Sequence, residues 1–153
     1  MISRRGFLLL GLFAGTAHAQ VPPNIQEIRR KALAEAIAKV VGNAHVRQGR
    51  VKLDVPPLID NGNMVPISVE VESPMTAADH VKAIHLFTER NPQPYVLTAY
   101  LGPRSGRARI ATRARIADTG QVTAIAQMSD GSFWSESVKV VVTLSACLEE
   151  GLI

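Results

Sequence analysis

The chain has 153 residues, of which 46% are hydrophobic and only 5% aromatic, and its 17 basic and 13 acidic residues give a formal net charge of +4. Aromatic residues are few and no block of Lys or Arg is continuous, which argues against a nucleic-acid-binding protein. After the N-terminal segment no apolar stretch approaches the roughly 20 residues that a membrane-spanning helix needs. We therefore expect a protein with no membrane span and no nucleic-acid partner.

Residues 1–19 have the pattern of an export signal. Arg4 and Arg5 precede a short apolar run, and small residues follow it up to Ala19. This order of a basic region, a short apolar region and an A-x-A site is typical of a signal that is cleaved after its last alanine. The paired arginines favour the twin-arginine route, and an ordinary secretory signal is the alternative. We expect a mature chain of residues 20–153 located in the periplasm.

One helix is predicted within the lead-in segment, residues 20–49. Asn24 and Glu27 approximate a capping box, in which two side chains bond the free N–H groups of the first helical turn. Over Ile25–Val41 the apolar residues fall mostly on one face, and Gly42 supplies a typical C-terminal stop. This apolar face predicts a helix that packs against another part of the protein.

After Gly49 apolar and polar residues alternate, which is typical of strands with one face on a core. Clusters of Pro, Gly, Asn and Asp separate these segments. The predicted strands are Arg50–Val55, Met64–Ser73, His80–Glu89, Tyr95–Leu101, Gly106–Ala117, Gln121–Met128 and Phe133–Ala146. Strands at this spacing predict an all-β fold, namely an immunoglobulin-like β-sandwich of about seven strands behind one N-terminal α-helix. We assign the sandwich domain to residues 50–147 and a short C-terminal tail to residues 148–153.

The fifth predicted strand separates basic residues from apolar ones. Every second residue from Ala108 to Ile116 is apolar or Thr and is expected to face the core, which leaves arginines on the opposite face. With one arginine just before the strand, this row consists of Arg104, Arg107, Arg109, Arg113 and Arg115. Such a row is often a solvated face that protects a sheet edge. The alternative is a surface for an anion or a partner protein, because the planar guanidinium donates parallel hydrogen bonds to oxyanions.

Cys147 is the only cysteine, so it cannot form a disulfide within the chain. An unpaired thiol in an exported protein suggests pairing with another chain or a reactive role, and a buried inert cysteine is the alternative. In the last predicted strand Cys147 has the parity of Lys139 and Thr143 rather than that of Val140 and Val142, so it follows the more polar face. This position favours an accessible thiol.

Two further patterns are weak evidence for a catalytic site or a metal site. Asp118-Thr119-Gly120 has the letters of the aspartic-protease triplet, but its place between two strands favours a hairpin turn. His80 and His85 have opposite parity on one strand, so they are not expected to share a metal ion. Because no acid, base and nucleophile occur in one pattern, we expect no metal, no cofactor and no enzyme.

Several sequence segments in the sandwich region resemble those of one known family, in their residues and in their order. These segments are residues 61–67 (NGNMVPI), 72–82 (ESPMTAADHVK), 87–94 (FTERNPQP), 101–106 (LGPRSG) and 126–133 (AQMSDGSF). Together they resemble SoxY, the cysteine-bearing subunit of the SoxYZ sulfur carrier of bacterial thiosulfate oxidation. The resemblance covers nearly all of the mature chain.

The resemblance implies an immunoglobulin-like carrier protein that pairs with a SoxZ-like subunit in the periplasm. In the family a cysteine near the C-terminus is loaded covalently with thiosulfate by a haem enzyme, SoxAX, and is then presented to SoxB and other Sox enzymes. Cys147 matches the position of this cysteine, but Ser145, Ala146, Leu148 and Glu149 stand where the family has a Gly-Gly-Cys-Gly-Gly arm. We expect a sulfur-compound carrier of the Sox thiosulfate-oxidation system, and the alternative is a SoxY-like binding or assembly subunit that is not loaded.

Overall fold

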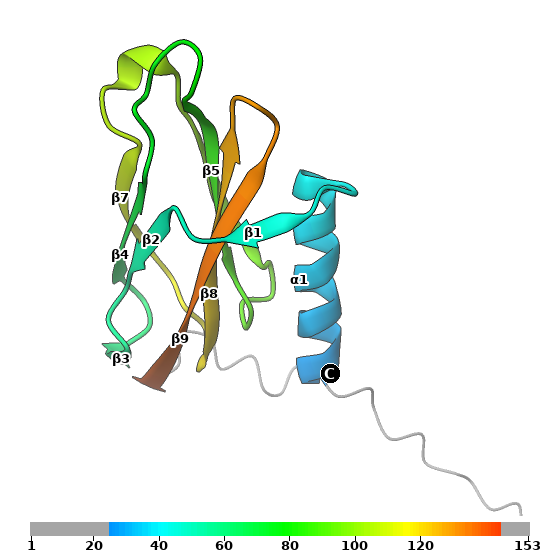
Figure 1. The fold of residues 1–153 in the computed structure, drawn as a ribbon. Coiled ribbons are helices and arrows are strands. Elements are labelled where there is room, and N and C mark those ends of the chain that lie inside the picture. The colour runs from blue at the N-terminus through cyan, green and yellow to red at the C-terminus, as the bar shows by residue number, and fades with distance from the viewer. Residues whose placement is uncertain (1–24, 145–153) are drawn as a thin grey trace, which may run out of the picture.

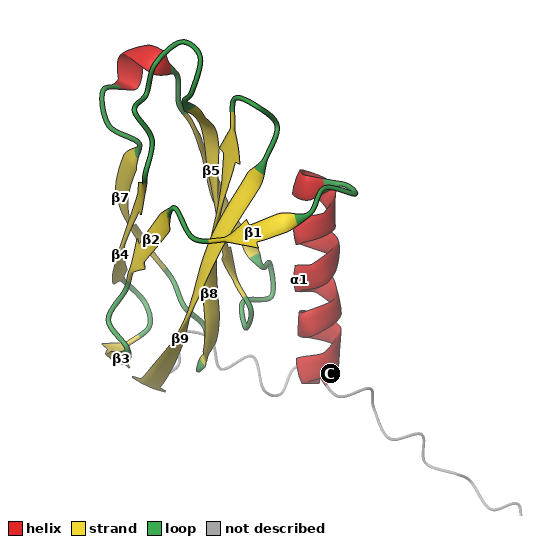
Figure 2. Cartoon of the chain, viewed as in Figure 1, coloured by secondary structure: helices red, strands yellow, loops and turns green. Residues whose placement is uncertain are grey.

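Residues 25–144 are described by the computed structural model of this protein, and Figures 1 and 2 show their arrangement. The elements are α1 (Ile25–Val41), β1 (Val46–Gln48), β2 (Val51–Asp54), β3 (Leu58–Asn61), β4 (Val65–Val71), β5 (Val81–Thr88), β6 (Tyr95–Tyr100), the 3-10 helix η1 (Pro103–Ser105), β7 (Arg109–Ala114), β8 (Gly120–Met128) and β9 (Phe133–Leu144). The expected export signal, Cys147 and the expected tail lie outside the described residues. No helix within residues 25–144 has the length and apolar character required to cross a membrane.

The strands form two packed layers, which confirms the predicted immunoglobulin-like sandwich. One sheet has the order β2-β4-β7, and the larger sheet has the order β1-β9-β8-β5-β6, with β3 also pairing with β9. In Figure 1 the three-stranded sheet lies on the left, the larger sheet in the middle and α1 on the right. The prediction of an all-β fold with one N-terminal helix is therefore confirmed.

The main core lies between the two sheets and follows the predicted alternation. In β4 the side chains of Val65, Ile67, Val69 and Val71 are at most 4% exposed. They belong to one cluster with apolar residues of the larger sheet, including Ile84, Leu86, Val122, Ala124 and Val140. Burial of this apolar surface is the dominant favourable contribution to folding.

Helix α1 begins and ends where the sequence predicts, and it packs on the outer face of the larger sheet. Phe87, Ile125 and Phe133 lie under it and are at most 5% exposed. The helix covers them with apolar side chains, which are Leu33, Ala36, Ile37, Val40 and Val41. As a result β5 and β8 are buried on both faces over most of their length, whereas the sequence prediction gives each strand a solvated face. The helix thus adds a third layer to the sandwich.

The strand prediction also differs from the structure in three details. The short strands β1 and β3 are not predicted, and both run parallel to β9. The predicted fifth strand, Gly106–Ala117, is shorter, because β7 covers only Arg109–Ala114. Asp118-Thr119-Gly120 is not a hairpin turn, since it connects β7 in one sheet to β8 in the other. A pattern that is local in sequence does not reveal a change of sheet.

Candidate functional site

Strand β9 leads toward Cys147 and is held by neighbours on both sides. It pairs antiparallel with β8 along most of its length and parallel with β3 near its end. Val142 N donates to Thr119 Oγ1 at 3.0 Å, and Thr143 Oγ1 donates to a β3 carbonyl at 3.1 Å. The strand ends at Leu144, and Cys147 follows three residues later, outside the described residues. The base of the cysteine-bearing segment is therefore fixed by the sandwich.

The loops near the end of β9 are tied to one another. Glu89 N donates to Gln121 O at 2.8 Å, and Gln121 N donates to Glu89 Oε2 at 3.1 Å. Asn91 accepts from Ala117 N at 2.8 Å and donates to Arg115 O at 2.9 Å. These bonds join the β5–β6 connection to the start of β8 and to the β7–β8 connection. The end of the sandwich beside Leu144 is consequently a platform of mutually bonded loops.

The predicted arginine row is divided among three places. Only Arg109 and Arg113 lie on β7, where the predicted alternation holds and both side chains are exposed. Arg104 lies in η1 and Arg107 follows it, before β7 begins, whereas Arg115 follows the end of β7. All five side chains are exposed. The row is thus a pair of arginines on one strand, with one further arginine in η1 and two in the connections at the two ends of that strand.

Charge on the outer face of the three-stranded sheet differs between its two ends. Glu70 of β4 lies between Lys52 of β2 and Arg109 of β7 in the strand register, so its carboxylate offsets their positive charge. Arg113 lies opposite Pro66 instead. Arg113 and Pro66 both line a surface hollow of about 660 Å³, where Asp54 is the one acidic lining residue. Arg113 is therefore the arginine on β7 whose neighbours leave it most available to an anionic group.

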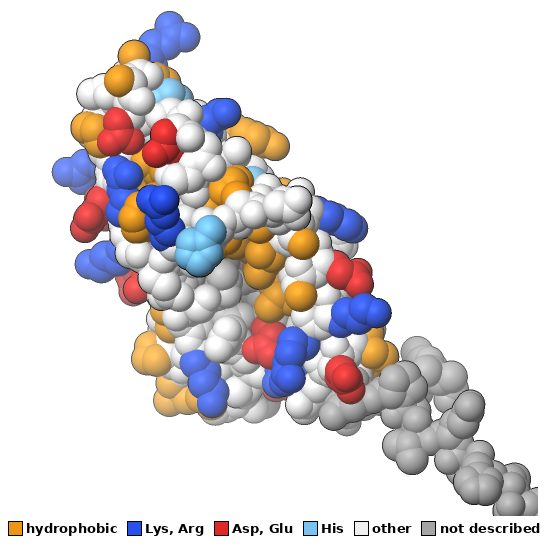
Figure 3. Space-filling view, turned by 45° about the vertical axis from the view of Figure 1, so that its right-hand side comes forward, with side chains coloured by type: hydrophobic (Ala, Val, Ile, Leu, Met, Phe, Trp, Pro, Cys, Tyr) orange, Lys and Arg blue, Asp and Glu red, His pale blue; other side chains and the backbone are white. Residues whose placement is uncertain are grey.

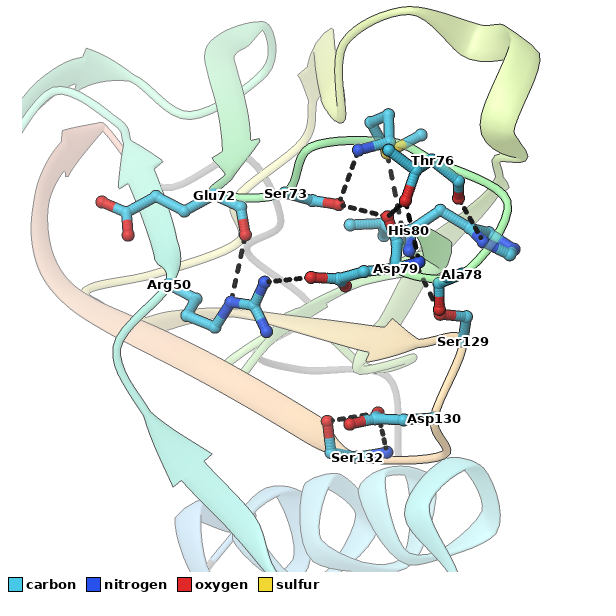
Figure 4. A network of polar contacts seen from close by, with 12 residues as sticks. Arg50, Glu72, Ser73, Thr76, Ala78, Asp79, His80, Ser129, Asp130 and Ser132 are labelled. Atoms are coloured by element: carbon cyan, nitrogen blue, oxygen red, sulfur yellow. Dashed lines mark hydrogen bonds and ion pairs between the residues drawn. The ribbon is translucent and has the colours of Figure 1, made fainter.

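A second polar cluster, near the β8–β9 turn, fixes the β4–β5 connection (Figure 4). Arg50 donates to Glu72 O at 3.1 Å, and its guanidinium lies 3.4 Å from the Asp79 carboxylate. Ser129 Oγ accepts from His80 N at 3.1 Å and donates to a carbonyl of the same connection at 3.1 Å. Because these polar groups bond one another, we assign the cluster a structural role.

The adjoining β8–β9 turn continues this cluster. Ser132 donates to Asp130 from both its backbone and its side chain, and these bonds lower the pKa of Asp130, with smaller contributions from Arg50 and Arg47. The guanidinium carbons of Arg47 and Arg50 lie 5.6 Å and 5.7 Å from the ring centroid of Trp134. The single tryptophan therefore reports on this end of the sandwich.

The described histidines are dispersed. His85 is 7% exposed on the outer face of β5, and its Nδ1 lies 2.6 Å from Thr98 Oγ1. Burial lowers the pKa of His85. His80 Nδ1 lies instead 3.1 Å from the carbonyl of Thr76. Within residues 25–144 no three His, Cys, Asp or Glu side chains come together as metal ligands would.

The sequence and the fold both match known proteins. The model of the family described as sulfur oxidation protein SoxY matches residues 37–147. The chain belongs to the SoxY family. The matched range contains all nine described strands and extends to Cys147. A comparison with curated proteins gives no match.

Solved structures share the sandwich. The sulfur carrier protein SoxY from Chlorobium limicola f thiosulfatophilum is 25% identical with a TM-score of 0.63, and the match covers 74% of this chain and 98% of that chain. Superoxide reductase (neelaredoxin) from Ignicoccus hospitalis is 20% identical with a TM-score of 0.54, covering 73% of this chain and 90% of that chain. The superoxide reductase from Nanoarchaeum equitans is 12% identical with a TM-score of 0.53, covering 63% and 100%. At these identities the reductases share the fold with this SoxY-family chain, and no more is inferred from them.

Proposed function

We propose that the protein carries sulfur compounds in thiosulfate oxidation and that Cys147 is the covalent attachment point. The observation that carries this proposal is the SoxY-family match, because its range includes the cysteine. The likeness to a SoxY sulfur carrier over nearly the whole of that chain supports the same role. The protein is then a carrier on which partner enzymes act.

The chemistry of attachment assigns separate tasks to the carrier and its partner. When thiosulfate is joined to the cysteine, a bond forms between Sγ and the terminal sulfur of thiosulfate. The thiol loses one proton and the two sulfur atoms together lose two electrons, which an external acceptor takes up. A SoxAX-like haem enzyme supplies that acceptor in this proposal, and a SoxB-like enzyme acts on the loaded carrier afterwards. The task of Cys147 is to present a thiolate, which is the reactive form of the thiol.

The fold limits how far the cysteine reaches. Cys147 follows Leu144 by three residues, so even a fully extended chain keeps their Cα atoms within about 11 Å. Partner enzymes must therefore approach the end of the sandwich where β3 and β9 lie side by side. Ser145 and Ala146 replace the glycines of the family arm, and they restrict the backbone more than glycine does. We infer that partner docking, more than a long swing of the arm, brings the thiol to each active site.

We also propose that the protein works in the periplasm as a heterodimer with a SoxZ-like subunit. The support is the twin-arginine pattern of residues 1–19 together with family membership. Replacing Arg4 and Arg5 with Lys should cause the uncleaved precursor to accumulate in the cytoplasm, as measured by cell fractionation and immunoblotting. Normal export of this variant would contradict the twin-arginine route.

The intact mass of the mature protein tests the carrier role. The protein is purified from cells grown with and without thiosulfate, and its mass is measured before and after treatment with a reductant. We expect a sulfur-bearing adduct that the reductant removes and that is missing in Cys147→Ser. An unmodified thiol in both cultures, with the partner subunit present, would contradict the proposal and favour a SoxY-like binding or assembly subunit.

A further inference from the structure

The edge strands of the two sheets differ in how they are protected against pairing with another chain. The larger sheet ends at β1 and β6, the smaller sheet ends at β2 and β7, and β3 pairs with β9 outside this order. All of these strands except β6 carry charged side chains, which are Arg47 of β1, Lys52 and Asp54 of β2, Asp60 of β3, and Arg109 and Arg113 of β7. Charged side chains are also spread over the face of the molecule that Figure 3 shows. Charges on an edge strand keep a sheet from adding a further strand.

Strand β6 lacks this protection. Its sequence from Tyr95 to Tyr100, YVLTAY, contains no charged residue and no proline, and most of its residues favour strands. Within residues 25–144 no strand pairs with the side of β6 that faces away from β5. The side chain of Tyr100 is 84% exposed. An uncharged strand of this composition at a free edge is a template for pairing with a second strand.

The backbone groups of β6 that face the free edge belong to alternate residues. Leu101 N donates to Lys82 O at 2.9 Å, so the backbone of Leu101 faces β5. Because bonded and non-bonded pairs alternate along an antiparallel ladder, the backbone of Ala99 also faces β5. The N–H and C=O groups of Thr98 and Tyr100 therefore face the free edge.

A second copy of the chain matches this edge. A two-fold axis perpendicular to the sheet at Ala99 places Thr98 of each copy opposite Tyr100 of the other copy. The backbone groups of these two residues then bond each other in both directions, once on each side of the axis, as in a regular antiparallel ladder. The bulge in β6, where Val96 has no partner on β5, lies outside this stretch.

The side chains on both faces of the joined sheet are also complementary. Leu97 and Leu101 are partly buried and pack against the core between the sheets. In the two-fold pairing Leu97 of one copy lies opposite Leu101 of the other, so the apolar layer continues across the junction. On the outer face Tyr100 of one copy lies beside Thr98 of the other, and no like charges meet. Hydrogen bonding, apolar contact and the lack of charge therefore agree on a second copy as the occupant.

We propose that two copies of the protein pair through β6 and form one continuous sheet with a two-fold axis at Ala99. The strand order then runs β8-β5-β6 in one copy and β6-β5-β8 in the other. Because strands related by this axis run in opposite directions, the ends of the two β9 strands point to opposite ends of the joined sheet. The inference goes beyond the carrier role and does not depend on it, since the pairing involves neither thiosulfate nor a Sox enzyme.

Sedimentation equilibrium of the mature chain provides the first test, in a reductant that prevents disulfides through Cys147. We expect monomers and dimers in an equilibrium that depends on protein concentration. Tyr100→Lys should raise the dissociation constant about tenfold or more, because the new charge occurs twice in a two-fold dimer. Met64→Lys adds the same charge at a side chain that is 68% exposed outside β6, so it should leave the constant unchanged. A wild-type protein that stays monomeric up to millimolar concentration, or equal constants for Tyr100→Lys and the wild type, would overturn the proposal.

Tyr100→Pro tests the backbone bonds without adding a charge. Proline lacks the N–H that faces the free edge, and an edge strand tolerates it at such a position. We expect the dissociation constant to rise about tenfold or more, since one ladder bond is lost on each side of the axis. Circular dichroism verifies that the variant is folded, and an unchanged constant in the folded variant would overturn the proposal.

Amide hydrogen exchange locates the interface within the dimer. As the protein concentration rises, we expect exchange to slow at Thr98 and Tyr100, whereas exchange at Ala99, whose N–H faces β5, should stay constant. Ala111 is the control at the other edge, because the β4–β7 bonds alternate in the same way and direct its N–H away from β4. Its exchange should not depend on concentration, since Arg109 and Arg113 protect that edge. A dimer without slower exchange at Thr98 and Tyr100 would overturn the proposal in favour of another surface.

Discussion

Thr119 and Val142 bond each other in both directions. Val142 N donates to Thr119 Oγ1 at 3.0 Å, and Thr119 Oγ1 donates to Val142 O at 3.4 Å. Thr119 precedes Gly120, whose pair with Val140 is the last backbone pair between β8 and β9. A side chain from the connection between the sheets therefore takes the place of a strand partner where β9 approaches Cys147.

Removal of the Thr119 hydroxyl should loosen this end of β9. Thr119→Val keeps the shape of the side chain but leaves the N–H and carbonyl of Val142 without this partner. These groups are largely shielded from water, since Val142 is only 7% exposed. We expect a loss of about 1–2 kcal/mol in the free energy of unfolding, measured in urea, and faster amide hydrogen exchange at Val142. Thr119→Ser retains the hydroxyl and serves as the control. Unchanged exchange at Val142 in Thr119→Val would show that the bond does not hold the strand.

The backbone at Gly120 leaves no room for a larger side chain. A Cβ at this position would lie 2.5 Å from Cγ of Arg90, and the Arg90 side chain is only 17% exposed beside Glu89. We therefore expect Gly120→Ala to destabilise the fold by roughly 1–3 kcal/mol through overpacking. Combining it with Arg90→Ala should recover part of this loss, because the two substitutions act on one contact. A double-mutant cycle by urea unfolding measures the coupling, and strictly additive losses would contradict the steric origin of the effect.

The sequence predicts those parts of the fold whose residue pattern reflects a single core. The α1 bounds and the inward face of β4 are correct, because periodicity records which side of an element is buried. The second buried face of β5 is not predicted, since it depends on where α1 packs. Strand β3 is not predicted either, because its partner is a strand about 80 positions later in the sequence. Elements that are defined by distant partners have no local signal.

The same reasoning applies to the candidate site. Cys147 stands out as the only cysteine in the sequence, and its attachment role stays a prediction. The exposure of Leu58 is not apparent from the sequence, because Leu58 and the buried Ile59 are both ordinary aliphatic residues there. Only the pairing of β3 with β9 determines that Leu58 points to solvent while Ile59 enters the core. Exposure of an apolar side chain is thus a tertiary property.

The stability of the protein should decrease as the pH falls below neutrality. Burial lowers the pKa of His85 from its ordinary value of 6.5, so at mildly acidic pH the unfolded chain binds a proton that the folded chain does not. The stability contributed by the neutral imidazole is therefore complete above the unfolded pKa and is lost as the pH falls toward the folded pKa. Between pH 8 and pH 5, the free energy of unfolding measured in urea should decline less steeply for His85→Gln than for the wild type. Tyr95→Phe removes a hydroxyl that bonds Thr98 but keeps the imidazole, so it should retain the wild-type slope. Identical slopes in His85→Gln and the wild type would contradict this assignment.

The contacts of Trp134 allow the contribution of the polar cluster to stability to be measured separately from that of the cation–π contacts. Arg47 and Arg50 lie at nearly equal distances from its ring, 5.6 Å and 5.7 Å, but the cluster bonds to Glu72 and Asp79 come from Arg50. Arg47→Met should therefore lower the free energy of unfolding by about 0.5 kcal/mol, the value of an exposed cation–π contact. Arg50→Met should lower it by about 1–2 kcal/mol, because a backbone hydrogen bond and a partly exposed ion pair are lost as well.

Urea unfolding followed by circular dichroism measures both losses without relying on the tryptophan that the substitutions surround. Fluorescence of Trp134, the only tryptophan in the chain, then reports whether the ring environment changes in each variant. Since Arg50 adopts a φ of 57°, Arg50→Gly should be less destabilising than Arg50→Ala, because glycine adopts this backbone conformation without the cost imposed by a Cβ. Equal losses for Arg47→Met and Arg50→Met would mean that the bonds to Glu72 and Asp79 contribute nothing measurable. The β4–β5 connection would then depend on its remaining bonds, such as those made by Ser129, to hold its position.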